Sequence, residues 1–186
     1  MLCDVRCEPA WDIRQSVPSR YDGPLPGPIV DRGALHRLLL PVRQAGARVA
    51  LTNGVFDLLH VGHLRYLRAA RAAADLLVVA VNTDASVRAF KPGRPFVPEV
   101  ERAELVAALE PVDFVVLFEE RTADGLLRDL RPDVYVKGAD YADKPLPEAS
   151  TARELGIEVR LVPLVPGRST SRLVEVLRQA PPTIAS

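Results

Sequence analysis

Two kinds of segment alternate along most of the chain. Short, nearly continuous apolar runs predict strands that are buried on both faces, and they occupy residues 49–51, 76–81, 114–118, 134–136 and 159–164. Between them lie longer segments in which apolar residues recur at the spacing of an amphipathic helix. This alternation predicts an α/β fold: a doubly wound (Rossmann-like) parallel sheet of about five strands flanked by helices.

Capping residues and prolines mark where the predicted helices begin and end. Asp31 precedes a segment in which Leu35, Leu38 and Leu39 share one helical face, and Thr122 is a cap-like residue before another. The further helices are predicted from residue 63 onward and over residues 99–109, 122–130, 147–155 and the segment that opens at 166–171 and runs to 179. The basic turn at 90–95 contains two prolines and a glycine, which exclude regular structure there.

The length of 186 residues is enough for one domain with a substantial core. Residues 1–28 contain prolines at 18, 24, 26 and 28 without any sustained period, which predicts an extended N-terminal arm. The domain itself is predicted over residues 29–180, with a short tail at 181–186. Cys3 and Cys7 form neither a disulfide framework nor a complete metal site, so both are interpreted as free thiols.

Composition narrows the classes of partner. Lys plus Arg and Asp plus Glu number 24 each, so the chain lacks the basic field that a nucleic-acid-binding protein usually carries. No apolar run approaches the ~20 residues of a membrane helix, and the N-terminus lacks a signal-peptide core. We therefore expect no nucleic-acid partner, no membrane association and a cytoplasmic location.

The segment from 49 to 67 has the strongest chemical signal in the chain. It is typical of strand, turn and helix, with Asn53-Gly54 at the turn and His60 and His63 on one face of the helix start. Free backbone N–H groups at such a start attract anions, and Gly62 lets a phosphate approach. The alternative is ordinary capping or half of a metal site, but the one other histidine is His36 and a third ligand is missing.

Thr52-Asn53-Gly54-Val55-Phe56-Asp57 followed by His60-Val61-Gly62-His63 resembles the signature of the HxGH nucleotidyltransferase superfamily, which includes the cytidylyltransferases. Within it, residues 29–179 are most similar to the bacterial heptose 1-phosphate adenylyltransferases that make ADP-heptose. The resemblance implies transfer of AMP from ATP, carrying Mg²⁺, to a sugar 1-phosphate with release of pyrophosphate. It also implies a homo-oligomer, either a dimer or a tetramer.

Three further stretches support this resemblance. Lys137-Gly138-Ala139-Asp140-Tyr141 resembles the family's Lys-Gly-Gly-Asp-Tyr, although Ala139 would be strained if its position required a positive φ. Ser169-Thr170-Ser171 resembles the terminal Ser-Thr-Thr motif that contacts nucleotide phosphates, and capping alone would explain one of these hydroxyls. The loop at 90–95 resembles one that brings a lysine over the phosphates.

The resemblance assigns candidate roles to individual residues. Catalytic roles fall on His60, His63 and Lys91. Nucleotide or phosphate binding falls on Thr52, Asn53, Gly54, Phe56, Gly62, Arg102, Lys137, Gly138, Asp140, Ser169, Thr170 and Ser171. Acceptor binding falls on Asp57, Asp84 and Arg94, where Asp57 and Asp84 are also candidates for the Mg²⁺ shell and Asp84 is equally a candidate helix cap.

The sequence lacks the motifs that several other types of reaction require. The sequence contains no Gly-x-Ser-x-Gly elbow, no cysteine–histidine pairing and no Gly-x-x-x-x-Gly-Lys-Ser/Thr loop, so transfer by positioning and charge stabilisation remains. A cytidylyltransferase acting on an alcohol phosphate such as glycerol 3-phosphate would share the histidine motif. A pantetheine-type or flavin adenylyltransferase would share the nucleotide too, whereas a non-catalytic nucleotide-binding module would be expected to lose the histidines or Lys91. The preference for ATP over CTP rests on the resemblance alone.

Overall fold

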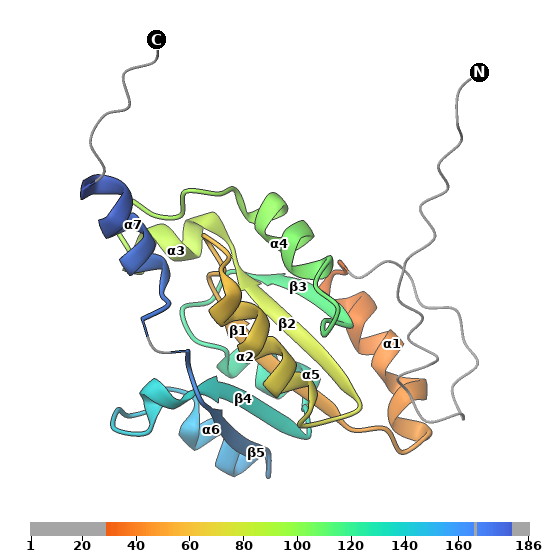
Figure 1. Ribbon diagram of the computed structural model, residues 1–186. Coiled ribbons are helices and arrows are strands. Elements are labelled where there is room, and N and C mark those ends of the chain that lie inside the picture. Colours follow the sequence, from red (N-terminus) through yellow and green to blue (C-terminus); the bar gives the residue numbers. More distant parts are fainter. Residues whose placement is uncertain (1–28, 166, 180–186) are drawn as a thin grey trace, which may run out of the picture.

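The computed structural model describes residues 29–165 and 167–179, which form a five-stranded, all-parallel sheet with helices on both faces (Figure 1). The strands are β1 (Val49–Gly54), β2 (Leu76–Asn82), β3 (Phe114–Phe118), β4 (Val134–Gly138) and β5 (Glu158–Val162). The helices are α1 (Arg32–Gln44), α2 (Val61–Arg71), α3 (Asp84–Phe90), α4 (Glu99–Ala107), α5 (Asp124–Leu130), α6 (Ala149–Glu154) and α7 (Thr170–Gln179), with a short 3₁₀ helix, η2 (Ala139–Tyr141). The predicted arm and tail, with Cys3 and Cys7, lie outside the described residues.

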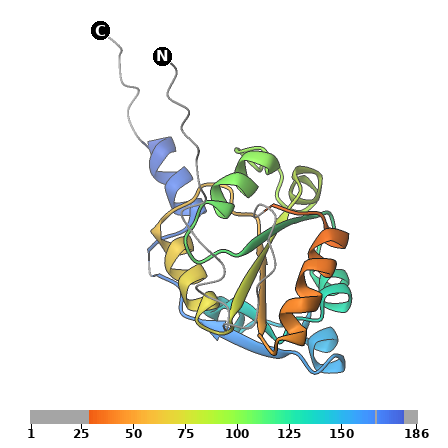
Figure 2. The same ribbon diagram turned by 90° about the vertical axis from the view of Figure 1, so that its right-hand side faces the viewer.

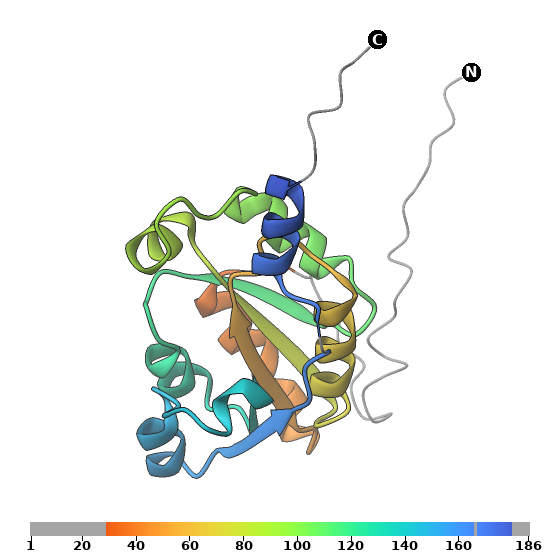
Figure 3. The same ribbon diagram turned by 60° about the vertical axis from the view of Figure 1, so that its left-hand side comes forward.

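The sheet separates two apolar clusters. Leu76 and Val78 of β2 pack with α1, α5 and α6 on one face, whereas Leu77 and Val79 pack with α2 and α4 on the other. Figures 2 and 3 show these two layers, with α1, α5 and α6 on one side of the strands and α2 on the other. Every residue of β2 is buried, because a central parallel strand has helices over both faces. The predicted doubly wound fold is confirmed.

Strand order places a crevice at the carboxyl ends of β1 and β4. The order is β3-β2-β1-β4-β5, so the chain winds in opposite directions on the two sides of the β1–β4 pair. The crossover through α2 covers one face of the sheet and the crossover through α6 covers the other. Open α/β sheets bind ligands where the winding reverses. The helix α7 lies beyond α2 at this end of the sheet (Figure 3).

Helix caps agree with the sequence at one position and differ at two. Asp31 caps α1, since its Oδ1 accepts a hydrogen bond from Ala34 N at 2.7 Å. Asp84 is the first residue of α3, and Thr83 is the cap. Thr122 does not cap α5, because its hydroxyl donates to Asp124 at 2.6 Å and Ala123 occupies the cap position.

Ala139 is not strained. Among the described residues the only non-glycine positions with positive φ are Phe56 and Arg131, so Ala139 keeps an ordinary backbone conformation at the start of η2. The replacement of a glycine by Ala139 therefore leaves the backbone after β4 undisturbed. Within the described residues, no helix is long and apolar enough to cross a membrane.

Candidate functional site

A cavity of about 480 Å³ opens at the carboxyl ends of the strands, where the winding of the sheet reverses. Most residues expected at a functional site line it: Asn53, Gly54, Phe56, Asp57, His60, Gly62, His63, Lys91, Arg94, Lys137, Gly138, Asp140, Ser169, Thr170 and Ser171. Thr52, Asp84 and Arg102 are not among its lining residues. The fold thus brings together segments that are more than 100 residues apart in the sequence.

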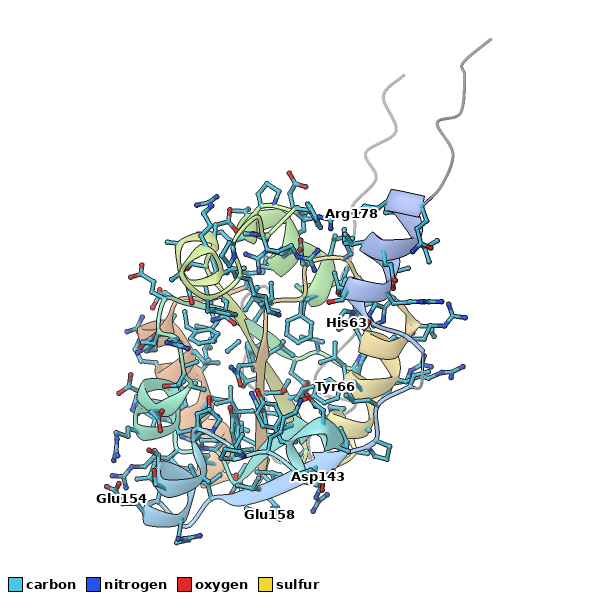
Figure 4. All side chains as sticks on the ribbon, turned by 90° about the vertical axis from the view of Figure 1, so that its left-hand side faces the viewer. His63, Tyr66, Asp143, Glu154, Glu158 and Arg178 are labelled. Carbon is cyan, nitrogen blue, oxygen red and sulfur yellow. The ribbon has the colours of Figure 1, made fainter. Side chains whose placement is uncertain are left out.

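The two histidines form a stacked pair at the start of α2. Their ring centroids are 4.0 Å apart with planes inclined by 23°, and the ring of Phe56 lies 5.5 Å from His63. The backbone N–H of His60 donates to Nδ1 of His63 at 3.3 Å. Because Nδ1 accepts this bond, a neutral His63 carries its proton on Nε2. In Figure 4, His63 and Tyr66 follow one another along α2, with His63 nearer the start of α7.

Burial lowers the pKa of both rings. Desolvation, assisted by the charge of His60, lowers the pKa of His63 to about 4. Desolvation also lowers the pKa of His60, and the neighbouring cation of Arg168 adds to this effect. A neutral Nε2–H is a hydrogen-bond donor without a full charge. His63 therefore suits donation to a phosphoryl oxygen better than ion pairing with it.

The burial of His63 predicts an unusual titration for this residue. The lowered pKa means that the folded protein binds a proton at His63 only when the pH falls to about 4, well below the ordinary histidine value of 6.5. Proton NMR of the ring signals, assigned with His63→Asn, measures this midpoint directly. A His63 midpoint near 6.5 in the folded protein would contradict the neutral assignment.

Gly62 leaves room for the ring of the histidine that lies two residues before it. A Cβ at this position would lie 2.8 Å from Cε1 and Nδ1 of His60, which is closer than Cβ atoms approach other atoms. The ring of His60 consequently occupies the space over the first turn of α2. The sequence predicts that a phosphate approaches here, and in the structure the imidazole of His60 lies beside the same glycine.

Asn53 is oriented by two residues of the neighbouring strand. Its Oδ1 accepts hydrogen bonds from the hydroxyl of Tyr135 at 2.6 Å and from Nζ of Lys137 at 3.1 Å. With the oxygen occupied twice, the amide NH₂ remains as a donor at the cavity wall. Tyr135 was not identified from the sequence, because it lies inside an apolar run that indicated only a buried strand.

Asp57 and Arg94 contact each other. The carboxyl group of Asp57 accepts hydrogen bonds from Phe96 N at 2.8 Å and Val97 N at 3.0 Å, and it pairs with Nε of Arg94 at 3.0 Å. These contacts attach the loop that follows Lys91 to the end of β1. The ion pair positions this loop, and both residues line the cavity, where the acceptor contacts expected of Asp57 and Arg94 stay predictions.

Arg102 is a buried clamp. Its side chain is fully buried and donates to three backbone carbonyls: Val97 O at 2.8 Å, Val55 O at 2.5 Å and Asn82 O at 2.8 Å. It also pairs with Asp84 at 2.7 Å. These contacts correct the phosphate-binding role expected for Arg102, since its donors already have partners inside the protein.

Asp84 and Thr52 also have partners within the protein. Asp84 is held by Arg102 and lies 3.5 Å from Arg88, so its expected contact with the acceptor is replaced by ion pairs. Thr52 is fully buried behind the cavity, with its hydroxyl 2.6 Å from that of Tyr66, which donates to Val136 O at 3.0 Å. These hydrogen bonds fasten α2 to β1 and β4, and they correct the phosphate contact expected of Thr52.

The start of α7 supplies the second helix terminus of the cavity. Ser169 Oγ accepts a hydrogen bond from Arg172 N at 3.1 Å, which is an ordinary capping contact, and Thr170 Oγ1 donates to Leu58 O at 3.4 Å. Arg168, which precedes this cap, also lines the cavity, and its Cβ lies beside Gly62. Sequence reasoning missed Arg168 as a site residue, although it directly precedes the hydroxyl motif.

Charge at the cavity favours an anionic ligand. Among the described residues, four cations line the cavity without forming an ion pair: Lys91, Arg121, Lys137 and Arg168. Arg94 is compensated by Asp57, and the other acidic residues of the lining are Asp140 and Glu148, so positive charge is in excess. The starts of α2 and α7 add free N–H groups and the positive ends of two helix dipoles. Such a cavity can hold several phosphate groups at once.

A doubly wound sheet with paired histidines and two helix starts at its switch point defines a domain of the nucleotidyltransferase class. Residues 51–180 match the family described as Cytidylyltransferase-like, and the chain belongs to that family.

Two curated relatives are named Bifunctional protein HldE. The protein from Syntrophotalea carbinolica is 46% identical over 145 residues, which cover 77% of this chain and 30% of that protein. The protein from Methylobacillus flagellatus is 48% identical over 136 residues, covering 73% and 28%. The chain thus spans less than a third of the length of these relatives.

A solved structure has the same fold. The crystal structure of the lipopolysaccharide core biosynthesis protein from Thermoplasma volcanium GSS1 is 32% identical to this chain and superposes with a TM-score of 0.53. The match covers 64% of this chain and 98% of that protein. Nearly the whole of the Thermoplasma protein therefore corresponds to the nucleotidyltransferase domain.

Proposed function

We propose that this domain transfers AMP from ATP to heptose 1-phosphate, giving ADP-heptose and pyrophosphate. The observation that carries the proposal is the stacked pair of His60 and His63 at the start of α2, inside a cavity with uncompensated cations. The identity to HldE proteins and the resemblance to heptose 1-phosphate adenylyltransferases indicate the acceptor. The chain spans under a third of those relatives, and the proposal concerns the activity of this domain alone.

The reaction is a displacement at phosphorus. A phosphate oxygen of the acceptor attacks the α-phosphorus of ATP, a new P–O bond forms, and the bond to the oxygen bridging the α- and β-phosphates breaks as pyrophosphate leaves. Negative charge builds on the phosphoryl and leaving oxygens. His63 donates from Nε2–H to this charge, and Lys91 and Arg168 balance the leaving group, so the protein acts by positioning and electrostatic stabilisation.

Mg²⁺ belongs to the proposal as the partner of ATP. Within the described residues, no three side chains of His, Cys, Asp or Glu gather as a metal cage. The two aspartates expected in its shell, Asp57 and Asp84, already hold backbone N–H groups or arginines. The protein therefore does not offer a dedicated site among these residues, and the ion would be ligated mainly by phosphates and water, as is usual for Mg²⁺.

A panel of acceptors tests the proposal. Heptose 1-phosphate, other sugar 1-phosphates and glycerol 3-phosphate are each combined with ATP or CTP, and pyrophosphate release is measured. We expect ATP with heptose 1-phosphate to give the highest kcat/KM. Faster turnover with CTP and glycerol 3-phosphate would support a cytidylyltransferase instead, and nucleotide binding without turnover of any acceptor would support a non-catalytic module. Assembly into a dimer or tetramer and a cytoplasmic location remain predictions.

A further inference from the structure

Glu148 is a buried acid on the cavity wall that the proposed phosphate chemistry does not use. It is 3% exposed, and its Oε1 accepts a hydrogen bond from Ala123 N at 2.9 Å. Its Oε2 is buried and has no hydrogen-bond partner among the described residues. A buried acceptor without a donor is costly to leave in a protein. The second oxygen of Glu148 therefore calls for a partner that these residues do not provide.

The nearby donors are directed elsewhere. The hydroxyl of Tyr135 also lies within reach of Glu148, but its directed hydrogen bond goes to Asn53 Oδ1 at 2.6 Å. Lys137 Nζ donates one of its three N–H groups to the same Asn53 oxygen, and its charge interacts with that of Glu148. Burial raises the pKa of Tyr135 and of Tyr141, and the negative charge of Glu148 raises both further. The carboxyl group thus lies close enough to influence both phenols. Its Oε2 remains open within a polar corner of the cavity.

Position and charge indicate what this corner can bind. The histidines lie at the start of α2, and Arg168 and Ser169 lie at the start of α7. Glu148 directly precedes α6, which covers the face of the sheet opposite to α2. Among the described residues Glu148 forms no ion pair, although the charge of Lys137 interacts with it from a greater distance. Such a carboxylate repels phosphate and accepts hydrogen bonds from neutral donors. Both substrates of the proposed reaction carry such donors as sugar hydroxyls.

We infer that Oε2 of Glu148 accepts a hydrogen bond from a sugar hydroxyl of a bound substrate, at the end of the cavity away from the helix starts. The inference rests on the proposed function, because that function supplies the two sugars. The hydroxyl belongs either to the acceptor sugar or to the ribose of ATP. Glu148 is then a specificity-determining residue that selects a polyol over a simple alcohol phosphate or a ribose over a deoxyribose.

The substitution Glu148→Gln tests the role of Oε2, because it changes this atom and leaves the contact of Oε1 in place. The amide oxygen can keep the bond to Ala123 N, while a neutral NH₂ donor replaces Oε2, so the substrate hydroxyl loses its charged acceptor. Calorimetry measures the affinities for ATP and for heptose 1-phosphate separately. We expect one of them to fall roughly tenfold to hundredfold, as for a hydrogen bond to a charged group, and the other to stay within about twofold. Glu154→Gln is the control, since Glu154 lies on α6, is exposed, and pairs with Arg128 at 2.8 Å.

Deoxy ligands test the same bond without a mutation. 2′-Deoxy-ATP, 3′-deoxy-ATP and singly deoxygenated sugar phosphates are titrated into wild-type protein and into Glu148→Gln. One deoxy ligand should bind the wild type about tenfold more weakly and lose little further in the variant, which identifies the hydroxyl and its source.

Two outcomes separate the inference from the function on which it rests. A folded Glu148→Gln protein with both affinities within about twofold of wild type would overturn the inference, as would wild-type protein that binds every deoxy ligand normally. If the wild type binds ATP but neither binds a sugar phosphate nor releases pyrophosphate, the proposed function fails. In that case the ATP and deoxy-ATP titrations still decide the role of Glu148.

Discussion

His63→Ala is expected to lower kcat by ~10²–10³ while the affinity for ATP stays within a few fold. The Nδ1 atom of His63 is occupied by the backbone N–H of His60, so the imidazole presents a neutral Nε2–H donor. A donor of this kind matters most when charge builds on the phosphoryl oxygens in the transition state. Steady-state kinetics at saturating acceptor and Mg²⁺, with calorimetry for ATP, separates kcat from binding.

Asn replacement distinguishes hydrogen-bond donation from charge. Burial lowers the pKa of His63 to about 4 in the free protein, so an amide that donates without charge should restore part of the lost rate if donation is what the ring supplies. His36→Ala is a matched control, since His36 is exposed on α1, far along the chain from the site. A wild-type kcat in correctly folded His63→Ala would refute a catalytic role and return the motif to helix capping.

The fold could be predicted from the sequence because short stretches of residues are enough to recognise its strands. A strand with helices over both faces must be apolar at nearly every position, so β2 and β3 could be recognised from composition alone. For α3 the sequence offered only Asp84 as a candidate cap and no helix range, because the helix has seven residues and starts in a polar segment. Its first turn is held by Thr83 and by Glu99, whose carboxyl accepts from Asp84 N across 15 residues.

The site was predictable only where chemistry follows from neighbouring residues. His60 and His63 are three residues apart at one helix start, so their proximity is a property of spacing. Glu148 reaches the cavity because α6 packs beside α5, and its bond to Ala123 spans 25 residues.

The internal contacts of Asp57 and of Arg102 could not be predicted from sequence spacing either. The Asp57–Arg94 pair and the contacts of Arg102 depend on how the loops fold back over the strand ends. The residue type alone does not show whether a basic or acidic side chain in a motif contacts a phosphate or another part of the protein. The burial that decides between these roles is a tertiary property.

Arg102→Ala is expected to lower the free energy of unfolding by roughly 3–5 kcal/mol, the range found when one partner of a buried charge pair is removed. The substitution leaves Val55 O, Val97 O and Asn82 O without their donor and leaves Asp84 without its buried partner. These groups belong to the ends of β1 and β2 and to the loop before α4, so the cavity should lose its shape together with stability. Urea denaturation followed by circular dichroism measures the loss, and failure of the variant to fold agrees with it.

Arg88→Ala provides the comparison, because Arg88 contacts the same aspartate from the surface. Its guanidinium lies 3.5 Å from Asp84 with the side chain 66% exposed, so its removal should cost at most about 1 kcal/mol. Arg102→Lys should fall between the two, since an ammonium group retains the charge but has three donors where the guanidinium has five. Equal stability of Arg102→Ala and Arg88→Ala would show that the buried clamp contributes no more than a surface pair, and it would reopen the question of whether Arg102 turns toward the phosphates.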